Sequence, residues 1–432
     1  MAQVGSSSNK FREPSLRMAG VDRACDESHP MTEAVRCYIS EAGARNVLEY
    51  RYGGCDNSLV YRYFCSPLAE SLVQRFVPLS VAPNLITCLG LLPTLLGHAL
   101  IWFYCADLKS SCPSWCWAAV GICTFLYQTV DNMDGKQARR TGTSSALGLL
   151  LDHEADALTI VIGSMNVAAM FQAGDSRVQC LIIWFTGALP FFFATWEEYH
   201  TGVLHLGILN GPTDGVLIMV AAQLVTAYAE EAASFWNATL VLGYSRKVCV
   251  LAFYVVCVFF TVLANFVSVH RTCVAQPADA AAGGARFLAA VRLTVPFSAS
   301  CVGGAAWLAG FGSSVFADEP RLLFWLLGVV FLNQVAHLQL AHLCGEVYRP
   351  WRLTFIVPFV LIVSNNLAAW LLRNDAAVPQ PPMDERLLVL GCIAGSLLAW
   401  LHFVWNVTQE MASVLGIRIF DISSAAAASK RS

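Results

Sequence analysis

The chain has 432 residues, of which 56% are hydrophobic and 13% charged, and its formal net charge is −3. Soluble domains carry roughly a quarter charged residues, so this composition predicts a membrane protein. The near-neutral balance offers no basic surface and excludes nucleic acid as a partner. Sixteen cysteines are scattered through apolar segments without paired metal-ligand spacing, so we interpret most of them as small buried hydrophobic side chains.

The N-terminal region lacks the apolar segment of a secretory signal. Residues 1–30 are rich in Ser, Arg and acidic residues, which predicts a disordered cytosolic tail. Residues 31–80 are expected to form cytosolic and interfacial helices. From 67 to 79, apolar residues recur at helical spacing with charged residues opposite, which predicts a helix in the membrane interface. A helix packed on the rest of the protein is the alternative for this segment.

Ten segments are long and apolar enough to span a bilayer, which predicts an all-α, polytopic integral membrane protein with about ten transmembrane helices. With the N-terminus in the cytosol, alternation places the basic loop at Arg140 and the C-terminal tail on the cytosolic side, as the positive-inside rule favours. Arg246 and Lys247 fall on the other side, against the rule. The predicted spans are residues 84–106, 113–133, 145–172, 178–199, 214–231, 248–270, 287–312, 320–345, 351–373 and 385–417.

Four aspartates interrupt the apolar sequence where the second and third predicted spans meet. Asp131 and Asp134 share one face of a helix, and Asp152 and Asp156 share one face of the next. Gly142 between the two pairs suits a chain reversal, and a Ser or Thr can cap the second helix. We therefore expect the two faces to meet and the four carboxylates to converge.

Converging carboxylates in apolar surroundings need a cation, because an unpaired buried charge costs on the order of several kcal/mol. Oxygen ligands favour Mg²⁺ or Mn²⁺, and two ions would balance four negative charges. Magnesium commonly binds substrate phosphates with its remaining positions, so the site predicts a phosphate-bearing ligand. Gly135, Ala138 and Gly148 leave room for that ligand against the helix backbone, and Arg139 offers a planar fork for a diphosphate.

The aspartates, small residues and arginine together resemble a family signature. The pattern Asp-x2-Asp-Gly-x2-Ala-Arg-x8-Gly-x3-Asp-x3-Asp, met at every specified position from Asp131 to Asp156, is similar to that of the CDP-alcohol phosphatidyltransferases. The run Asp-Asn-x-Asp-Gly-Lys-Gln-Ala-Arg-Arg-Thr and the Asp152-His153 pair resemble the choline and ethanolamine (aminoalcohol) phosphotransferase branch. Pieces within residues 50–58 and 210–213 also resemble this branch.

The resemblance implies a metal-dependent enzyme of phospholipid synthesis. It would transfer phosphoethanolamine or phosphocholine from CDP-ethanolamine or CDP-choline to diacylglycerol or alkyl-acylglycerol. The products would be phosphatidylethanolamine or phosphatidylcholine and CMP, in the final step of the CDP-amino alcohol (Kennedy) pathway. An apolar acceptor explains an active site inside the membrane, because a soluble enzyme would have to extract it from the bilayer.

The same resemblance implies an organisation and a location. Residues 81–215 would form the catalytic core, residues 216–418 the remaining transmembrane helices and residues 419–432 a cytosolic tail. The implied location is the endoplasmic reticulum membrane, with the Golgi as the alternative and the active site facing the cytosol. The sequence leaves open monomer or homodimer, ethanolamine or choline, acyl or ether-linked acceptor, and Mg²⁺ or Mn²⁺.

The resemblance also implies roles for individual residues. His153 adjoins a metal ligand and can titrate near neutral pH, and in the resembling branch this position is the base that takes the acceptor's proton. In the wider family the fourth aspartate has that role, so Asp156 is the competing base. The implied metal ligands are Asp131, Asp134, Asp152 and Asp156. The implied nucleotide-binding residues are Gly135, Ala138, Arg139, Gly148 and Asn84, the last with a role at the helix start as the alternative.

Two departures and a possible head-group site concern neighbouring residues. Glu154-Ala155 stand where the branch usually has Gly-Cys, and Ala146 stands where it usually has Pro. On helical geometry Glu154 projects away from the aspartates, so we expect a structural or gating role. The ammonium of the substrate could be received by Trp196, Glu197 and Tyr199. An interfacial anchor is the favoured interpretation of Trp196.

A membrane transporter or metal carrier is the alternative class of protein, because intramembrane carboxylates also mark ion pathways. Against it stand the nucleotide cradle of Gly135, Ala138 and Arg139 and the absence of repeated halves in the sequence. Transport would survive Arg139→Ala, whereas nucleotide-dependent transfer would not.

Overall fold

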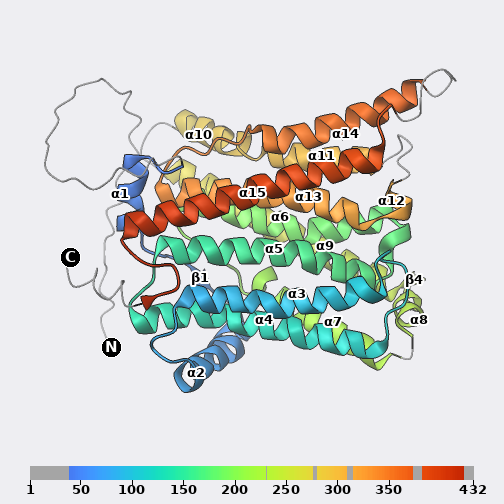
Figure 1. Ribbon diagram of the computed structural model, residues 1–432, viewed down its shortest axis with the longest axis horizontal. Coiled ribbons are helices and arrows are strands. Elements are labelled where there is room, and N and C mark those ends of the chain that lie inside the picture. Colours follow the sequence, from blue (N-terminus) through green and yellow to red (C-terminus); the bar gives the residue numbers. More distant parts are fainter. Residues whose placement is uncertain (1–37, 230, 276–279, 309–314, 373–381, 423–432) are drawn as a thin grey trace, which may run out of the picture. The chain divides into compact units, whose positions relative to one another are not determined.

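The computed structural model is almost entirely helical, and its described strands are no longer than three residues (Figure 1). This confirms the prediction of an all-α fold. The predicted tail of residues 1–30 lies outside the described residues. The structure describes residues 38–422 apart from residue 230 and the segments 276–279, 309–314 and 373–381.

Fifteen α-helices are found in this described part of the chain. They are α1 (Glu41–Glu49), α2 (Ser66–Phe76), α3 (Pro83–Tyr104), α4 (Ser114–Thr141), α5 (Ala146–Met170), α6 (Arg177–Thr201), α7 (Val216–Tyr228), α8 (Ala232–Asn237), α9 (Arg246–Ala275), α10 (Ala280–Arg292), α11 (Val295–Leu308), α12 (Val315–Asp318), α13 (Arg321–Cys344), α14 (Leu353–Leu372) and α15 (Glu385–Leu415). Four short strands pair in two ladders: β1 (Cys55–Asp56) with β2 (His205–Leu206), parallel, and β3 (Thr239–Val241) with β4 (Tyr244–Ser245), antiparallel.

Helix α3 packs against both α4 and α5, which carry the aspartate motif (Figure 1). Helix α7 packs on α4, α6 packs on α5, and α9 packs on α6. Helix α13 contacts α5, α6 and α15, and 89% of its most apolar window is buried within the protein. The central helix α13 therefore supports α5 from behind, while α3 contacts both motif helices.

Six helices in the described part of the chain are long and apolar enough to cross a membrane, or seven if the bent pair α10 and α11 forms one span. The prediction of ten spans is not confirmed, although every predicted span overlaps a helix or this pair. Helix α7 has 13 residues and continues directly from the π-helix of five residues, Gly211–Gly215, so the combined helical run of 18 residues approaches the ~20 that a bilayer requires. Helices α4 and α5 carry the polar motif, which lowers their mean hydropathy. Most of the exposed surface of α9 is apolar, which suits contact with lipid.

The segment predicted as an interfacial helix packs against α4. In α2, Ala69 and Val73 are fully buried, whereas Phe76 is 73% exposed. The guanidinium of Arg140 donates to the carbonyl of Val73 at 2.9 Å, and the ammonium of Lys136 donates to the hydroxyl of Ser66 at 2.9 Å. These contacts support the alternative of a helix packed on the rest of the protein, and the position in the membrane interface stays a prediction. Of the helices expected within residues 31–80, the described α-helices are α1 and α2.

Candidate active site

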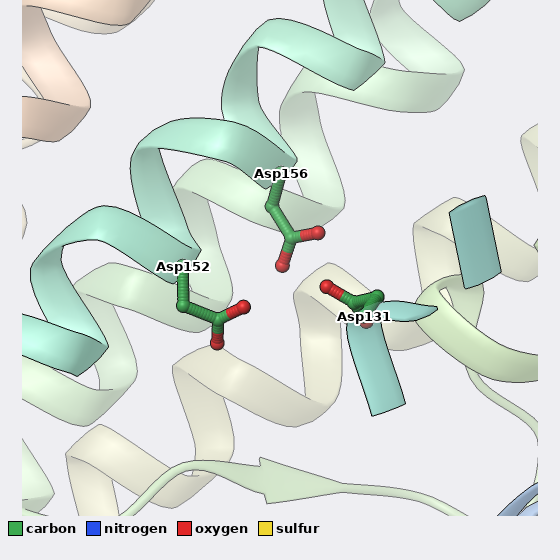
Figure 2. A group of neighbouring side chains, drawn as sticks. All are labelled: Asp131, Asp152 and Asp156. Atoms are coloured by element: carbon green, nitrogen blue, oxygen red, sulfur yellow. The ribbon is translucent and has the colours of Figure 1, made fainter. Parts of the chain in front are cut away.

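Three of the motif aspartates bring their carboxylates together. Asp131 extends from α4, while Asp152 and Asp156 extend from successive turns of α5 toward it (Figure 2). One oxygen from each of the three lies within 4.8 Å of the others, close enough for a single cation to contact all of them. No other group of His, Cys, Asp or Glu in the described residues meets this criterion.

The connection between α4 and α5 explains why the two helices face each other. Gly142 ends α4 with φ 67°, in the left-handed region that a glycine adopts without steric cost. The backbone amide of Thr143 donates to the carbonyl of Ala138 at 2.9 Å and closes the turn. Ser145 then caps α5, because its hydroxyl accepts a hydrogen bond from the amide of Gly148 at 3.2 Å. The predicted reversal at Gly142 and the predicted Ser or Thr cap are both confirmed.

Asp134 lines the same cavity but lies outside the three-carboxylate cluster. Its carboxylate accepts a hydrogen bond from the hydroxyl of Thr87 in α3. A spacing of three residues rotates a side chain by about 60° around a helix, whereas a spacing of four rotates it by about 40°. The directions of Asp131 and Asp134 therefore differ more than those of Asp152 and Asp156. We expected four carboxylates to converge, but only three cluster, and Asp134 lies apart on the same cavity.

Two tyrosines lie close to the carboxylates. The hydroxyl of Tyr127 in α4 donates to Asp156 Oδ1 at 2.5 Å. Tyr52, in the loop after α1, is half exposed at the cavity. Partial burial, and after it the nearby Glu198 and Asp152 carboxylates, raise the pKa of Tyr52 above its usual range. Its phenol therefore stays protonated at neutral pH and can act as a hydrogen-bond donor beside the cluster. Neither tyrosine was identified as a site residue from the sequence.

The aspartates line a cavity of about 1960 Å³. This volume exceeds the roughly 300–1,000 Å³ of an ordinary small-molecule pocket. Beyond Asp156 the cavity continues along α5 to Val167, about 16 Å further at 1.5 Å per residue. Its walls there are mainly apolar, with Ile160 in α5, Ile183 in α6 and Phe260 in α9 among them, although polar side chains and other helices also contribute. The cavity thus joins a polar chamber to an apolar one.

All five predicted nucleotide-binding residues line the polar chamber. An alanine Cβ at position 135 would lie 3.4 Å from the nearest Arg139 nitrogen, and one at position 148 would lie 3.5 Å from Asn84 Oδ1. Both are ordinary van der Waals distances, so the protein itself does not require glycine there, and the free space faces the cavity. The amide group of Asn84 donates to the Ile419 carbonyl at 2.9 Å. The five residues are Asn84, Gly135, Ala138, Arg139 and Gly148.

Two loops that are far apart in sequence are joined over this chamber. Strand β1 pairs with β2, and Asp56 in β1 accepts three hydrogen bonds through its carboxylate. The donors are the amide nitrogen of Ser58 at 2.8 Å, the side chain of Asn210 at 2.9 Å and the hydroxyl of Thr213 at 2.8 Å. Ser58 in turn donates through its hydroxyl to Asp214 at 3.1 Å. The two outlying pieces of sequence that resemble the family are therefore one structural unit.

His153 lies on the cavity wall but is held from behind. Its Nδ1 lies 3.2 Å from the carbonyl oxygen of Leu149, one turn earlier in α5. Its Nε2 lies 3.6 Å from Oε2 of Glu198 in α6. Glu198 was missed in the sequence, although an ionisable residue within a membrane-length segment is itself a signal of function.

The proposed head-group residues separate in the structure. Trp196 is fully buried and its indole donates to the Ala290 carbonyl at 3.0 Å, so neither the ammonium site nor the interfacial anchor describes it. Tyr199 donates through its hydroxyl to the Glu346 carbonyl at 3.0 Å. Of the three candidates, Glu197 alone lines the cavity.

Glu154 projects away from the metal cluster, as expected. The indole of Trp400 in α15 donates to its Oε2 at 2.7 Å, and the carboxylate is buried between α5 and α15. This contact supports the structural interpretation of the residue that departs from the typical pattern.

A membrane protein with a cluster of carboxylates beside a small-residue cradle and an apolar chamber has the features of an intramembrane phosphotransferase. A family model for CDP-alcohol phosphatidyltransferase matches residues 80–242. Choline/ethanolaminephosphotransferase 1 of Arabidopsis thaliana is 32% identical over 89% of this chain and 98% of its own length. An uncharacterised class-I family protein of Dictyostelium discoideum is 30% identical over the same shares, and ethanolaminephosphotransferase 1 of Homo sapiens is 24% identical over 89% of this chain and 94% of its own length.

The chain belongs to the CDP-alcohol phosphatidyltransferase family. It is a multi-span membrane phosphotransferase that acts in phospholipid synthesis with a CDP-alcohol as donor. This identification favours the enzyme over the transporter or metal carrier.

Proposed function

We propose that the enzyme transfers phosphoethanolamine or phosphocholine from CDP-ethanolamine or CDP-choline to diacylglycerol or alkyl-acylglycerol, releasing CMP. The observation that carries this proposal is the continuity of the cavity, which leads from the three carboxylates into an apolar chamber along α5, α6 and α9. A charged nucleotide suits the first part and a lipid acceptor suits the second. Relatives named choline/ethanolaminephosphotransferase support this pair of head groups.

The polar chamber fits a metal-bound diphosphate. Asp131, Asp152 and Asp156 offer oxygen ligands within reach of one Mg²⁺ or Mn²⁺, and Asp134 on the same cavity can contribute to a second. Ions bound there would neutralise charge on the diphosphate and on the departing CMP. The planar guanidinium of Arg139 would bind the diphosphate. The absence of a side chain at Gly135 would let the diphosphate lie close to the helix backbone.

His153 is the base that the geometry favours. A carbonyl oxygen only accepts hydrogen bonds, so the contact with Leu149 places the ring hydrogen on Nδ1 and leaves Nε2 as the acceptor. Asp156 already accepts the Tyr127 hydroxyl. The acceptor hydroxyl would give its proton to His153 Nε2 while its oxygen bonds to the phosphorus that carries the head group. The bond between that phosphorus and the CMP oxygen breaks, and CMP leaves with the electron pair.

The basic residues near the aspartate cluster indicate which side of the membrane the cluster faces. Lys136 and Arg140 lie at the end of α4 that carries the aspartates, and positive charge favours the cytosolic side. We place this end at the cytosolic surface of the endoplasmic reticulum membrane, where a soluble nucleotide can enter, with the Golgi as the alternative.

An assay of the purified enzyme with diacylglycerol tests the substrates. CDP-ethanolamine and CDP-choline are each supplied with Mg²⁺ and with Mn²⁺, and phospholipid is measured. Transfer from at least one donor is expected, together with its near-complete loss in Arg139→Ala. Absence of transfer from both donors with both metals would contradict the proposed substrates.

A further inference from the structure

One buried carboxylate lies between two histidines from different helices. Glu198 in α6 is 1% exposed. Its Oε2 lies 3.6 Å from Nε2 of His153 in α5, and its Oε1 lies 3.6 Å from Nε2 of His342 in α13. The hydroxyl of Tyr50 lies 3.4 Å from the same nitrogen of His342. A carboxylate in such a position is costly to bury, so its presence needs an explanation.

Ordinary helix packing does not explain this carboxylate. Two other buried glutamates each accept a short side-chain hydrogen bond through one oxygen, Glu154 from Trp400 and Glu197 from Asn265, although Oε1 of Glu154 accepts none from the described residues. Oε2 of Glu198 accepts no hydrogen bond from the described residues and is instead aimed at His153. Its role therefore involves the histidine that it faces.

A second metal site does not explain it either. Among the described residues, the aspartate cluster is the one group of His, Cys, Asp and Glu compact enough to hold a cation, so His153, Glu198 and His342 do not qualify. Glu198 is also absent from the described residues that line the cavity, whereas His153 is among them. Glu198 thus reaches the reaction only through His153.

The contacts of His153 define what Glu198 can do. The hydrogen bond from Nδ1 to the Leu149 carbonyl restricts the rotation of the His153 ring. The distance of 3.6 Å to Glu198 is too long for a hydrogen bond, so the lone pair of Nε2 stays free for the acceptor hydroxyl. It is short enough for a negative charge to attract a ring that has accepted a proton.

We propose that Glu198 is a positioning residue for His153. It keeps Nε2 at the cavity wall and stabilises the positive charge that the ring carries after it accepts the proton, while His342, in contact with Tyr50, faces Glu198 from the opposite side. The proposal rests on the role of His153 given above.

The Glu198→Gln variant of the full-length enzyme tests this proposal, because glutamine keeps the shape and removes the charge. We expect kcat to fall on the order of tenfold, the size typical of an outer partner of a functional histidine, with KM for the CDP-amino alcohol unchanged. Glu198→Asp should recover part of the lost kcat. Glu154→Gln, which alters a buried glutamate on the opposite side of α5, is the matched control and should keep the wild-type kcat.

The other outcomes are equally decisive. The proposal would be overturned if Glu198→Gln had an unchanged kcat, or if its KM for the CDP-amino alcohol rose as much as its kcat fell. Failure of this variant to fold would also overturn it, because Glu198 would then serve helix packing. These results differ from a failure of the proposed function, which would appear as wild-type rates in His153→Ala or as no transfer by the wild-type enzyme.

Discussion

Asp56 Oδ2 accepts a hydrogen bond of 2.8 Å from the hydroxyl of Thr213, which lies 157 residues further along the chain. Together with the Asn210 contact and the β1–β2 ladder, it joins two loops over the polar chamber. Both loops contribute residues to the cavity wall, among them Tyr52 and Leu206. The shape of the chamber entrance therefore depends on a contact distant from the aspartates.

Asp56→Ala should loosen this entrance. Removing the carboxylate takes away the acceptor of the Thr213 hydroxyl and the cross-loop acceptor of Asn210, so the two loops can separate. We expect KM for the CDP-amino alcohol to rise about tenfold. We also expect a protease to cleave the loops of the variant at a lower protease concentration than those of the wild type. Asp175→Ala, at a highly exposed ion pair with Lys109, is the control and should change neither. An unchanged KM in Asp56→Ala would show that the loops hold together without it.

Gly54→Ala should act on the same entrance through Tyr52. A Cβ at position 54 would lie 1.9 Å from the Tyr52 hydroxyl, so the phenol must move, although the backbone need not. We expect a several-fold rise in KM for the CDP-amino alcohol with little change in the thermal unfolding midpoint. Gly53 does not line the cavity, and in Gly53→Ala the added Cβ would meet its nearest atom at an ordinary 3.5 Å, so this control should behave as wild type. Equal KM values in the two variants would remove Tyr52 from substrate binding.

Gly163→Leu should obstruct the acceptor without affecting the nucleotide. Gly163 lies in α5 on the apolar chamber, and a Cβ there meets no atom within 4 Å, so a larger side chain would extend into free space. We expect KM for diacylglycerol to rise about tenfold, most strongly for long acyl chains, and KM for the CDP-amino alcohol to stay the same.

Gly395→Leu is the matched control for that prediction. Gly395 in α15 also has open space around its Cβ position but does not line the cavity. If both leucine variants change diacylglycerol kinetics alike, the apolar chamber is not the acceptor site.

Removal of divalent metal should stop transfer reversibly. A chelator is expected to abolish activity, and added Mg²⁺ or Mn²⁺ should restore it, because the three clustered carboxylates repel one another without a cation. In Asp131→Asn the metal concentration for half-maximal activity should rise at least tenfold. Full activity in the presence of the chelator would contradict a metal-dependent mechanism.

Local sequence rules predicted the parts of this site that are set by local geometry. The spacing of Asp152 and Asp156, the reversal at Gly142 and the cap of α5 follow from helical period and turn chemistry, and the structure reproduces them. The departure of Asp134 depends on Thr87 in another helix, which no pattern along the chain reports.

Long-range contacts account for most of what the sequence could not show. The pairing of Asp56 with Thr213 and of Glu198 with two histidines joins residues from distant segments. The number of spans stays a prediction, because six or seven helices in the described part of the chain meet the length and hydropathy expected of a span. Trp196 was misassigned because an aromatic residue in an apolar helix looks the same whether it faces lipid or the core.

The central claim is that the aspartate cluster drives phosphoryl transfer from a CDP-amino alcohol to a lipid alcohol. Its most direct test measures CMP and phospholipid together, in the same reaction, for the wild-type enzyme and for Asp152→Asn in lipid nanodiscs with saturating Mg²⁺ or Mn²⁺. We predict equal molar amounts of the two products from the wild type and a loss of both of at least about a thousandfold in the variant. Phospholipid formation by Asp152→Asn at the wild-type rate, or CMP release by the wild type without phospholipid, would contradict the claim.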